Sequence, residues 1–311
     1  MAKGSKSVYH TIDPPFVYAA SAIVEGIFTL LFVSTFAFGI LRLSAKVRPI
    51  WYYYTAAMAA LLIGYILRIA SFSVYAYYDK PEVYLAFEDR YLFMLLSAKR
   101  LEPVARLFRH MGAALCSVLL VEIGQRYSWV WNKRTPLRIG RAAVWMLAGG
   151  ASVLALAHCI LAEREINPDL NVVERLGMPR LDDVFNGDKT VAALVSAVLL
   201  LLFAGGLMVL AMVIHASHAA LSEDKRTAPS HDVSIHISIS TLLLVASVIL
   251  VIVRGWNMAE VSLLLNPHRR AKANDMAWWY WCELALDRFG TWVVLFVVYR
   301  VGKKALVLDR R

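Results

Sequence analysis

The chain has 311 residues, 59% of them hydrophobic, and its 33 Lys and Arg residues outnumber its 23 Asp and Glu residues, giving a formal net charge of +10. Soluble domains contain about 45–50% apolar residues, so this composition indicates a membrane protein. The positive charge does not indicate a nucleic-acid partner, because in a membrane protein the placement of basic residues relative to the spans carries the information. Cys116, Cys159 and Cys282 all lie in apolar segments, so we expect neither a disulfide framework nor a Cys-x-x-Cys metal site.

Seven apolar segments approach or exceed the length of about 20 residues that a helix needs to cross the hydrocarbon core of a bilayer. They lie at about 17–41, 52–78, 104–125, 142–162, 190–217, 233–255 and 278–300. The sequence therefore predicts an all-α fold, a polytopic membrane protein with a bundle of seven transmembrane helices. We expect one membrane domain over residues 1–311, without an appended soluble domain.

The basic residues between these segments predict the orientation of the bundle. Lys46 and Arg48 lie in the first link, five basic residues and no acid lie in the third, and Lys303 and Lys304 follow the last segment. Loops rich in Lys and Arg stay on the cytoplasmic side, so the C-terminus is predicted to be cytoplasmic and the N-terminus lumenal or outside the cell. The link between the sixth and seventh segments is basic yet falls on the lumenal side of this arrangement. We expect the protein in the endoplasmic reticulum or another endomembrane.

Two links between the segments carry recognisable patterns. The stretch 79–103 contains an amphipathic run at 84–96. Such a run either lies on the lumenal membrane surface or packs as a lid over the bundle, and the sequence leaves both arrangements open. The polar stretch 172–188 contains Pro and Gly residues and is predicted to be a connecting loop.

Charged residues inside the apolar segments form the clearest pattern in the chain. Each such charge costs roughly 2.5–3.5 kcal/mol at the centre of a span, so we expect it to face protein or a wet cavity. Counting along each segment from its ends places these charges in one layer, in the lumenal half of the bundle. The layer consists of Glu25, Arg68, Arg109, Arg254, Glu260, Glu283, Asp287 and Arg288.

Two explanations of this layer stay open. In the first, acids and bases on neighbouring helices pair only to fix the order of the helices, as Glu25 and Arg68 would. In the second, the layer is a functional site. Asp287 and Arg288 favour the second explanation, because adjacent residues on an α-helix point about 100° apart and do not readily pair. The neighbouring Trp and Tyr residues likewise indicate either a binding surface or an aromatic belt at the membrane interface.

Two families share features with this sequence. Gly64-Tyr65-Ile66-Leu67-Arg68 resembles the Gly-Tyr-x-x-Arg fragment of a fungal family of lipid-translocating exporters, although apolar residues replace the acid that precedes it there. The chain length, the seven spans and the acids buried in one half of the bundle are similar to those of the integral-membrane terpene cyclases of fungal meroterpenoid pathways, of the ascofuranone and ascochlorin type. This second resemblance implies a metal-independent cyclase or isomerase that needs no cofactor and acts on a lipophilic, prenylated small molecule.

The chemistry of such a cyclase assigns roles to the charged layer. Cyclisation begins when a carboxylic acid protonates an epoxide or an olefin, and desolvation keeps that acid protonated. The expected acids are Asp287, Glu283 and Glu25. Aromatic faces stabilise the resulting cation. The expected substrate-binding residues are Arg68, Tyr65, Arg254, Trp256, Asn257, Tyr280 and His110.

The alternative function is that of a seven-span receptor or lipid exporter. In that case the same polar layer binds an amphipathic ligand, and Arg68 and Arg254 hold its anionic headgroup. Membrane lipids surround the protein under either function. Removing a charge by Asp287→Asn distinguishes catalysis from a structural role, since a catalytic acid affects turnover whereas a structural ion pair affects folding.

Overall fold

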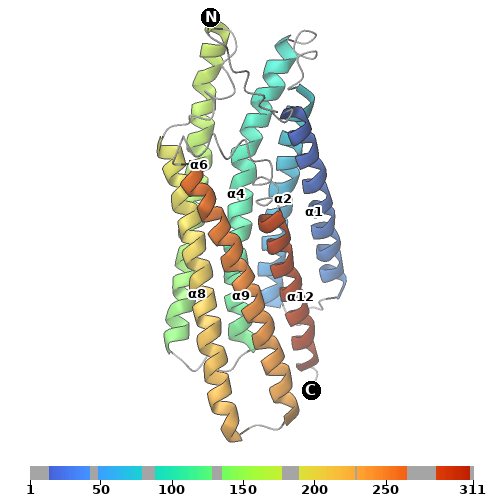
Figure 1. Cartoon of the computed structure of the whole chain (residues 1–311), viewed down its shortest axis with the longest axis vertical. Coiled ribbons are helices and arrows are strands. Elements are labelled where there is room, and N and C mark those ends of the chain that lie inside the picture. The colour runs from blue at the N-terminus through green and yellow to red at the C-terminus, as the bar shows by residue number, and fades with distance from the viewer. Residues whose placement is uncertain are drawn as a thin grey trace, which may run out of the picture.

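A computed structural model describes residues 14–42, 48–78, 88–127, 135–176, 189–227, 230–264 and 285–308, and the structural statements below concern these ranges. Within them the chain forms seven α-helices and one short π-helix, and no strand (Figure 1). The elements are α1 (Pro14–Arg42), α2 (Arg48–Tyr78), α4 (Glu88–Tyr127), α6 (Thr135–Leu176), α8 (Lys189–Thr227), α9 (Ser230–Leu264), the π-helix η2 (Ala285–Phe289) and α12 (Gly290–Leu308). The prediction of an all-helical fold is confirmed.

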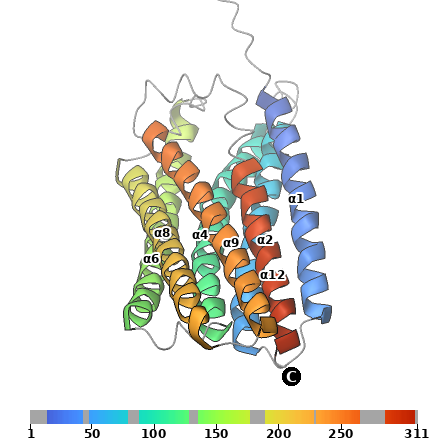
Figure 2. The same cartoon turned by 60° about the horizontal axis from the view of Figure 1, so that its bottom comes forward.

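The helices run alternately up and down, so that each packs against its neighbour in sequence (Figures 1 and 2). The α4 helix lies innermost, because it contacts α2, α6, α8, α9 and α12. The first and last described helices, α1 and α12, are in contact, and there the Trp292 indole donates to Thr35 Oγ1 at 2.9 Å. The bundle has an upper half, in which α1 begins and α2 ends, and a lower half, in which α1 ends and α2 begins (Figure 1).

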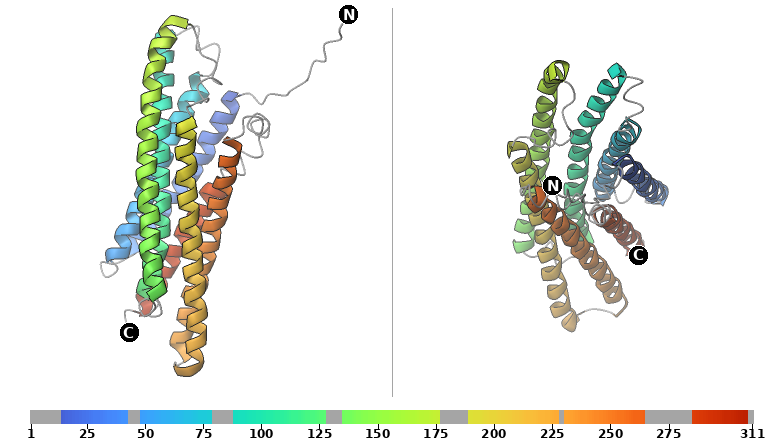
Figure 3. Two further views of the ribbon diagram at one scale, coloured as in Figure 1. Left: turned by 90° about the vertical axis from the view of Figure 1, so that its left-hand side faces the viewer. Right: turned by 45° about the horizontal axis from the view of Figure 1, so that its top comes forward.

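Five helices are long and apolar enough to cross a membrane: Ile50–Tyr77, Leu96–Gln125, Thr135–Glu163, Ala193–Ala219 and Ser238–Ala259. A shorter apolar stretch, Ala22–Thr35, lies in α1. The α6 helix, which forms one side of the bundle in Figure 3, exposes 71% of Met146 and 66% of Val153. Such exposure of large apolar side chains is typical of helices that contact lipid, since water penalises it. These features point to a membrane protein.

Two buried hydroxyl groups in these helices bond within their own helix, whereas Ser71 Oγ on α2 donates to the Ala98 carbonyl oxygen on α4 at 3.1 Å. Thr29 Oγ1 donates to the Glu25 carbonyl oxygen at 2.7 Å, and Ser247 Oγ donates to the Leu243 carbonyl oxygen at 2.7 Å. A bilayer offers no water to satisfy such groups, so the preceding turn of the helix provides the acceptor. These hydroxyl groups are therefore satisfied by the protein's own backbone.

The helix boundaries differ from the prediction in three places. The α4 helix begins at Glu88 instead of near 104, so from Glu88 onward the amphipathic run is part of α4 and forms neither a separate surface segment nor a lid. Pro103 lies inside this helix, where it removes only one backbone hydrogen bond. The α6 helix continues to Leu176, into the stretch predicted as loop. The last helical region contains η2 before α12, and residues 278–284 lie outside the described ranges.

Candidate functional site

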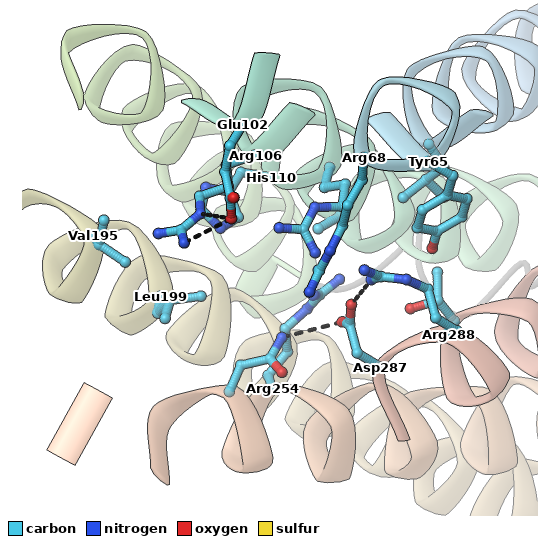
Figure 4. Close-up of a pocket in the computed structure, with 15 residues that line it drawn as sticks. Tyr65, Arg68, Glu102, Arg106, His110, Val195, Leu199, Arg254, Asp287 and Arg288 are labelled. Atoms are coloured by element: carbon cyan, nitrogen blue, oxygen red, sulfur yellow. Dashed lines mark hydrogen bonds and ion pairs between the residues drawn. The ribbon is translucent and has the colours of Figure 1, made fainter. Parts of the chain in front are cut away.

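Five residues of the charged layer, Arg68, Arg109, Arg254, Asp287 and Arg288, line a cavity of about 70 Å³ in the upper half of the bundle (Figure 4). The cavity lies between α2, α4, α8, α9, η2 and the first turn of α12. One water molecule needs about 10–15 Å³ on this scale, so the space accommodates a small polar group. The lining residues are Leu61, Tyr65, Arg68, Glu102, Arg106, Arg109, His110, Ala113, Val195, Leu199, Arg254, Asn257, Asp287, Arg288 and Thr291.

Helical spacing brings these side chains to one face of each helix. On α9, Arg254 and Asn257 are three residues apart and therefore neighbours on the helix surface. The lining residues of α2 and α4 follow the same spacing of three or four residues. Gly64 on α2 permits the close approach of α4, because a Cβ atom there would lie 2.7 Å from Arg109 Cγ and 3.0 Å from the Ala105 carbonyl oxygen. The backbone at Gly64 thus helps to place Arg109 beside the cavity.

A buried ion pair joins α1 to η2. Glu25 has 0% and Arg288 1% of its surface exposed. Arg288 Nη2 donates to Glu25 Oε1 at 2.7 Å, and Arg288 Nε donates to Glu25 Oε2 at 2.9 Å. Such bidentate pairs are among the strongest hydrogen-bonded contacts in proteins. Arg68 Nε lies 3.4 Å from Glu25 Oε1, so α2 joins the same cluster. The Arg288 guanidinium carbon also lies 4.5 Å from the centre of the Tyr65 ring.

The π-helix changes the expected relation between Asp287 and Arg288. Arg288 Nη1 pairs with Asp287 Oδ2, although these residues are adjacent. The expectation that adjacent residues do not readily pair is therefore wrong here. A π-helix has more residues per turn than an α-helix, so adjacent side chains diverge less. Asn257 on α9 donates a second hydrogen bond to Asp287, with its Nδ2 3.2 Å from Oδ1.

The arginines of the described site outnumber its acids. Five arginines line the cavity, whereas the described acids there are Glu102, Asp287 and, behind the wall, Glu25. Glu102 is engaged with Arg106, whose Nη2 lies 2.9 Å from Glu102 Oε1. Even with all three acids ionised, two positive charges are left uncompensated among these side chains. The arginines are Arg68, Arg106, Arg109, Arg254 and Arg288.

Two of these arginines have hydrogen-bond donors without acceptors. Arg254 is 3% exposed, and its Nε and Nη2 have no hydrogen-bond partner in the described part of the chain. The buried Nε of Arg109 also has none. A buried donor without an acceptor costs about 1–3 kcal/mol, and more when it is charged. Among the described residues, the charge and the open donors at the cavity favour an anion over a cation there.

Most of the predicted site residues meet at this cavity. Tyr65, Arg68, His110, Arg254, Asn257 and Asp287 line it. Glu25 lies behind the wall, held by Arg288 and Arg68, and Trp256 is half-buried on α9 without lining the cavity. Glu283 and Tyr280 lie outside the described residues, and the side chain of Glu260 is not described.

The sequence-based assignment of site residues missed Glu102 and Arg106. Both were assigned to a loop or to the first turns of a span, where charge needs no explanation. Their spacing of four residues, typical of an ion pair on one helix face, was the available signal. The apolar part of the wall, Val195 and Leu199 on α8, carried no signal because it is indistinguishable from ordinary core.

No family model, no curated protein and no solved structure matches this chain. The two resemblances drawn from the sequence therefore stay predictions. The function has to be argued from the contacts of the cavity itself.

Proposed function

We propose that this protein binds an amphipathic molecule with an anionic headgroup inside its helical bundle, as a lipid exporter or a receptor for such a molecule does. The excess of arginines around a buried cavity carries this proposal. Uncompensated charge within a membrane is costly, and a bound anion would remove that cost. Of the two functions predicted from the sequence, this is the one that the contacts support better.

The size and lining of the cavity support an amphipathic ligand whose headgroup alone is enclosed. Sites that enclose a whole small molecule have volumes of about 300–1,000 Å³. The cavity here has about 70 Å³, enough for a headgroup. Leu61, Ala113, Val195 and Leu199 provide an apolar part of the wall for the first carbons of a chain. The remainder of the ligand's hydrocarbon tail would lie among the helices or in the bilayer.

The contacts support a terpene cyclase less well. A proton donor must hold its proton, whereas Glu25 and Asp287 both pair with Arg288, and an opposite charge at this distance stabilises the carboxylate form. A prenyl chain also needs more space than about 70 Å³ to fold for ring closure. Cyclisation, with Glu283 as a further acid outside the described residues, stays a prediction. Loss of turnover in a folded Asp287→Asn protein would favour it.

We propose in addition that all seven helices cross the membrane, with α1 and α12 as the first and last spans. This arrangement places the N-terminus in the lumen or outside the cell and the C-terminus in the cytoplasm, in the endoplasmic reticulum or another endomembrane. The alternation of helix direction and the basic links support it. A glycosylation acceptor inserted within 79–87 should be modified in microsomes, and one inserted within 128–134 should not. The reverse pattern would overturn the orientation.

Thermal unfolding of the full chain in neutral detergent tests the binding function. Oleic acid and oleoyl lysophosphatidic acid, which are anionic, should raise the Tm, whereas lysophosphatidylcholine and monoolein should raise it much less. A ligand that binds only the folded state stabilises it by about 2.7 kcal/mol at one hundred times its Kd. Arg254→Gln should abolish the difference between ligands. Arg300→Gln, which removes the same charge from an exposed position on α12, should preserve it. Equal shifts with anionic and zwitterionic ligands would overturn the proposal.

A further inference from the structure

The protein shows twice how its arginines bind an oxyanion. Arg288 uses its Nε and Nη2 to bind both oxygens of Glu25, at 2.9 and 2.7 Å. Arg141 uses the same two atoms to bind Glu122, at 2.8 Å to Oε1 and 3.0 Å to Oε2. The Nε–H and Nη2–H bonds point the same way along one edge of the planar guanidinium, and their spacing matches two oxygens of a carboxylate or phosphate.

Arg254 presents the same edge without an acceptor. Its Nε and Nη2 correspond to the pair of atoms that are occupied in Arg288 and Arg141, and neither has a hydrogen-bond partner among the described residues. The residue is 3% exposed and lines the cavity, so bulk water does not replace the missing acceptor. One complete bidentate oxyanion site is therefore left open inside the bundle.

A third donor comes from a second helix. Arg109 on α4 lines the same cavity, and within the described ranges its buried Nε also has no hydrogen-bond partner. The Asp287 carboxylate lies within electrostatic reach of both Arg109 and Arg254, and both arginines line the same cavity. Figure 4 shows Arg254 and Asp287 side by side at that cavity. A carboxylate offers two oxygens and one negative charge. A phosphate monoester offers three terminal oxygens and a charge of about −1.5 to −2.

We infer that Arg254 is the bidentate anchor for a phosphate monoester headgroup and that Arg109 contacts its third oxygen. The three open donors and the two uncompensated positive charges match this group better than a carboxylate. This inference rests on the proposed function and narrows it to one class of amphiphile. The phosphate belongs to a lipid, because the wall also contains the apolar side chains of Leu61, Val195 and Leu199.

Binding measurements on the full chain in zwitterionic nanodiscs test this assignment with four anionic probes and one zwitterionic reference. The probes are oleoyl lysophosphatidic acid, oleic acid, glycerol 3-phosphate and inorganic phosphate, and the reference is lysophosphatidylcholine. We expect oleoyl lysophosphatidic acid to bind at least about tenfold more tightly than oleic acid, since each hydrogen bond to a charged group contributes about 1.5–3 kcal/mol. The two soluble phosphates should bind more weakly than the lipid but compete with it.

Arg254→Lys is the most informative variant, because it keeps the positive charge and removes the pair of parallel N–H donors. It should weaken binding of the phosphate monoester and of oleic acid, each about tenfold, because both present two oxygens to that edge. Arg109→Lys should weaken the phosphate monoester alone, whereas the control Arg300→Lys on α12 should leave all four affinities unchanged. Each unliganded variant should have a Tm close to that of the unmodified protein, which would show that it folds.

The outcomes separate this inference from the function on which it rests. Two results would overturn the phosphate assignment while the proposed binding of an anionic amphiphile would stand. One is that oleic acid binds as tightly as the phosphate monoester, and the other is that Arg254→Lys binds the phosphate monoester as tightly as the unmodified protein does. If inorganic phosphate bound as tightly as the lipid, the claim that the phosphate belongs to a lipid would be wrong, whereas the phosphate site itself would stand. No preference for any anion over lysophosphatidylcholine would overturn both.

Discussion

Two polar clusters join α4 to its neighbours, and they differ in how fully their donors and acceptors are matched. In the lower half, Glu122 accepts from Arg141 Nε at 2.8 Å and Nη2 at 3.0 Å and from the Trp145 indole at 2.9 Å. One acid there meets one base, and the cluster links α4 to α6. In the upper half, five arginines face three described acids, and Arg254 has open donors. A matched cluster holds helices together, whereas the excess of arginines over described acids in the upper cluster supports the proposed binding of an anion.

The largest effect is expected when the matched pair within the upper cluster is broken. Glu25→Gln would leave Arg288, 1% exposed, without its bidentate acceptor. Removing one partner of a buried ion pair typically costs about 3–5 kcal/mol. The yield of monodisperse protein in gel filtration should therefore fall steeply, along with the Tm. Normal yield and Tm would show that Glu25 is not part of the framework, and it would then become a stronger candidate for an acid that acts on substrate.

Arg254→Gln should separate ligand binding from stability. The unliganded variant should unfold at the same or a higher temperature, because a buried charge without an acceptor has been removed. The stabilisation by an anionic amphiphile, about 2.7 kcal/mol at one hundred times its Kd, should be lost. Paired thermal unfolding curves with and without ligand measure both effects. A large drop in the unliganded Tm would instead mean that Arg254 holds the bundle together.

Gly64→Ala should disturb the wall of the cavity through packing alone. The added Cβ would lie 2.7 Å from Arg109 Cγ and 3.0 Å from the Ala105 carbonyl oxygen, and a backbone atom cannot move aside cheaply. Overpacking of this kind costs about 1–3 kcal/mol. Gly149→Ala on α6 is the matched control, because nothing lies within 4 Å of a Cβ atom there. The control should be neutral or slightly stabilising, since Ala favours helix over Gly by up to about 1 kcal/mol. Equal Tm values for both variants would contradict the close approach of α2 and α4.

The sequence predicted the helical fold and most of the charged layer, because both follow from rules that act along one helix. Apolar length indicates a span, and charge inside a span indicates a polar interior. Which charges pair depends on contacts between helices, as between Glu25 on α1 and Arg288 on η2. The π-helix η2, which brings the Asp287 side chain to Arg288, has no known signature in the sequence. Glu102 was missed because it lies in the stretch predicted to connect two spans, whereas α4 begins at Glu88 and continues through Pro103.

The smallest effect tests whether the lower cluster is independent of the cavity. Glu122→Gln keeps an oxygen that accepts from Arg141 or Trp145 and removes only the charge. The Arg141 side chain is 39% exposed, so solvent screens the pair and the loss should be about 1 kcal/mol or less. Affinity for an anionic amphiphile should be unchanged, because the change lies at the other end of α4 from Glu102 and Arg106. If Glu122→Gln lowered the affinity for an anionic amphiphile, the cluster around Glu122 would not be purely structural. The match of acids to bases would then no longer distinguish a structural cluster from a binding cluster.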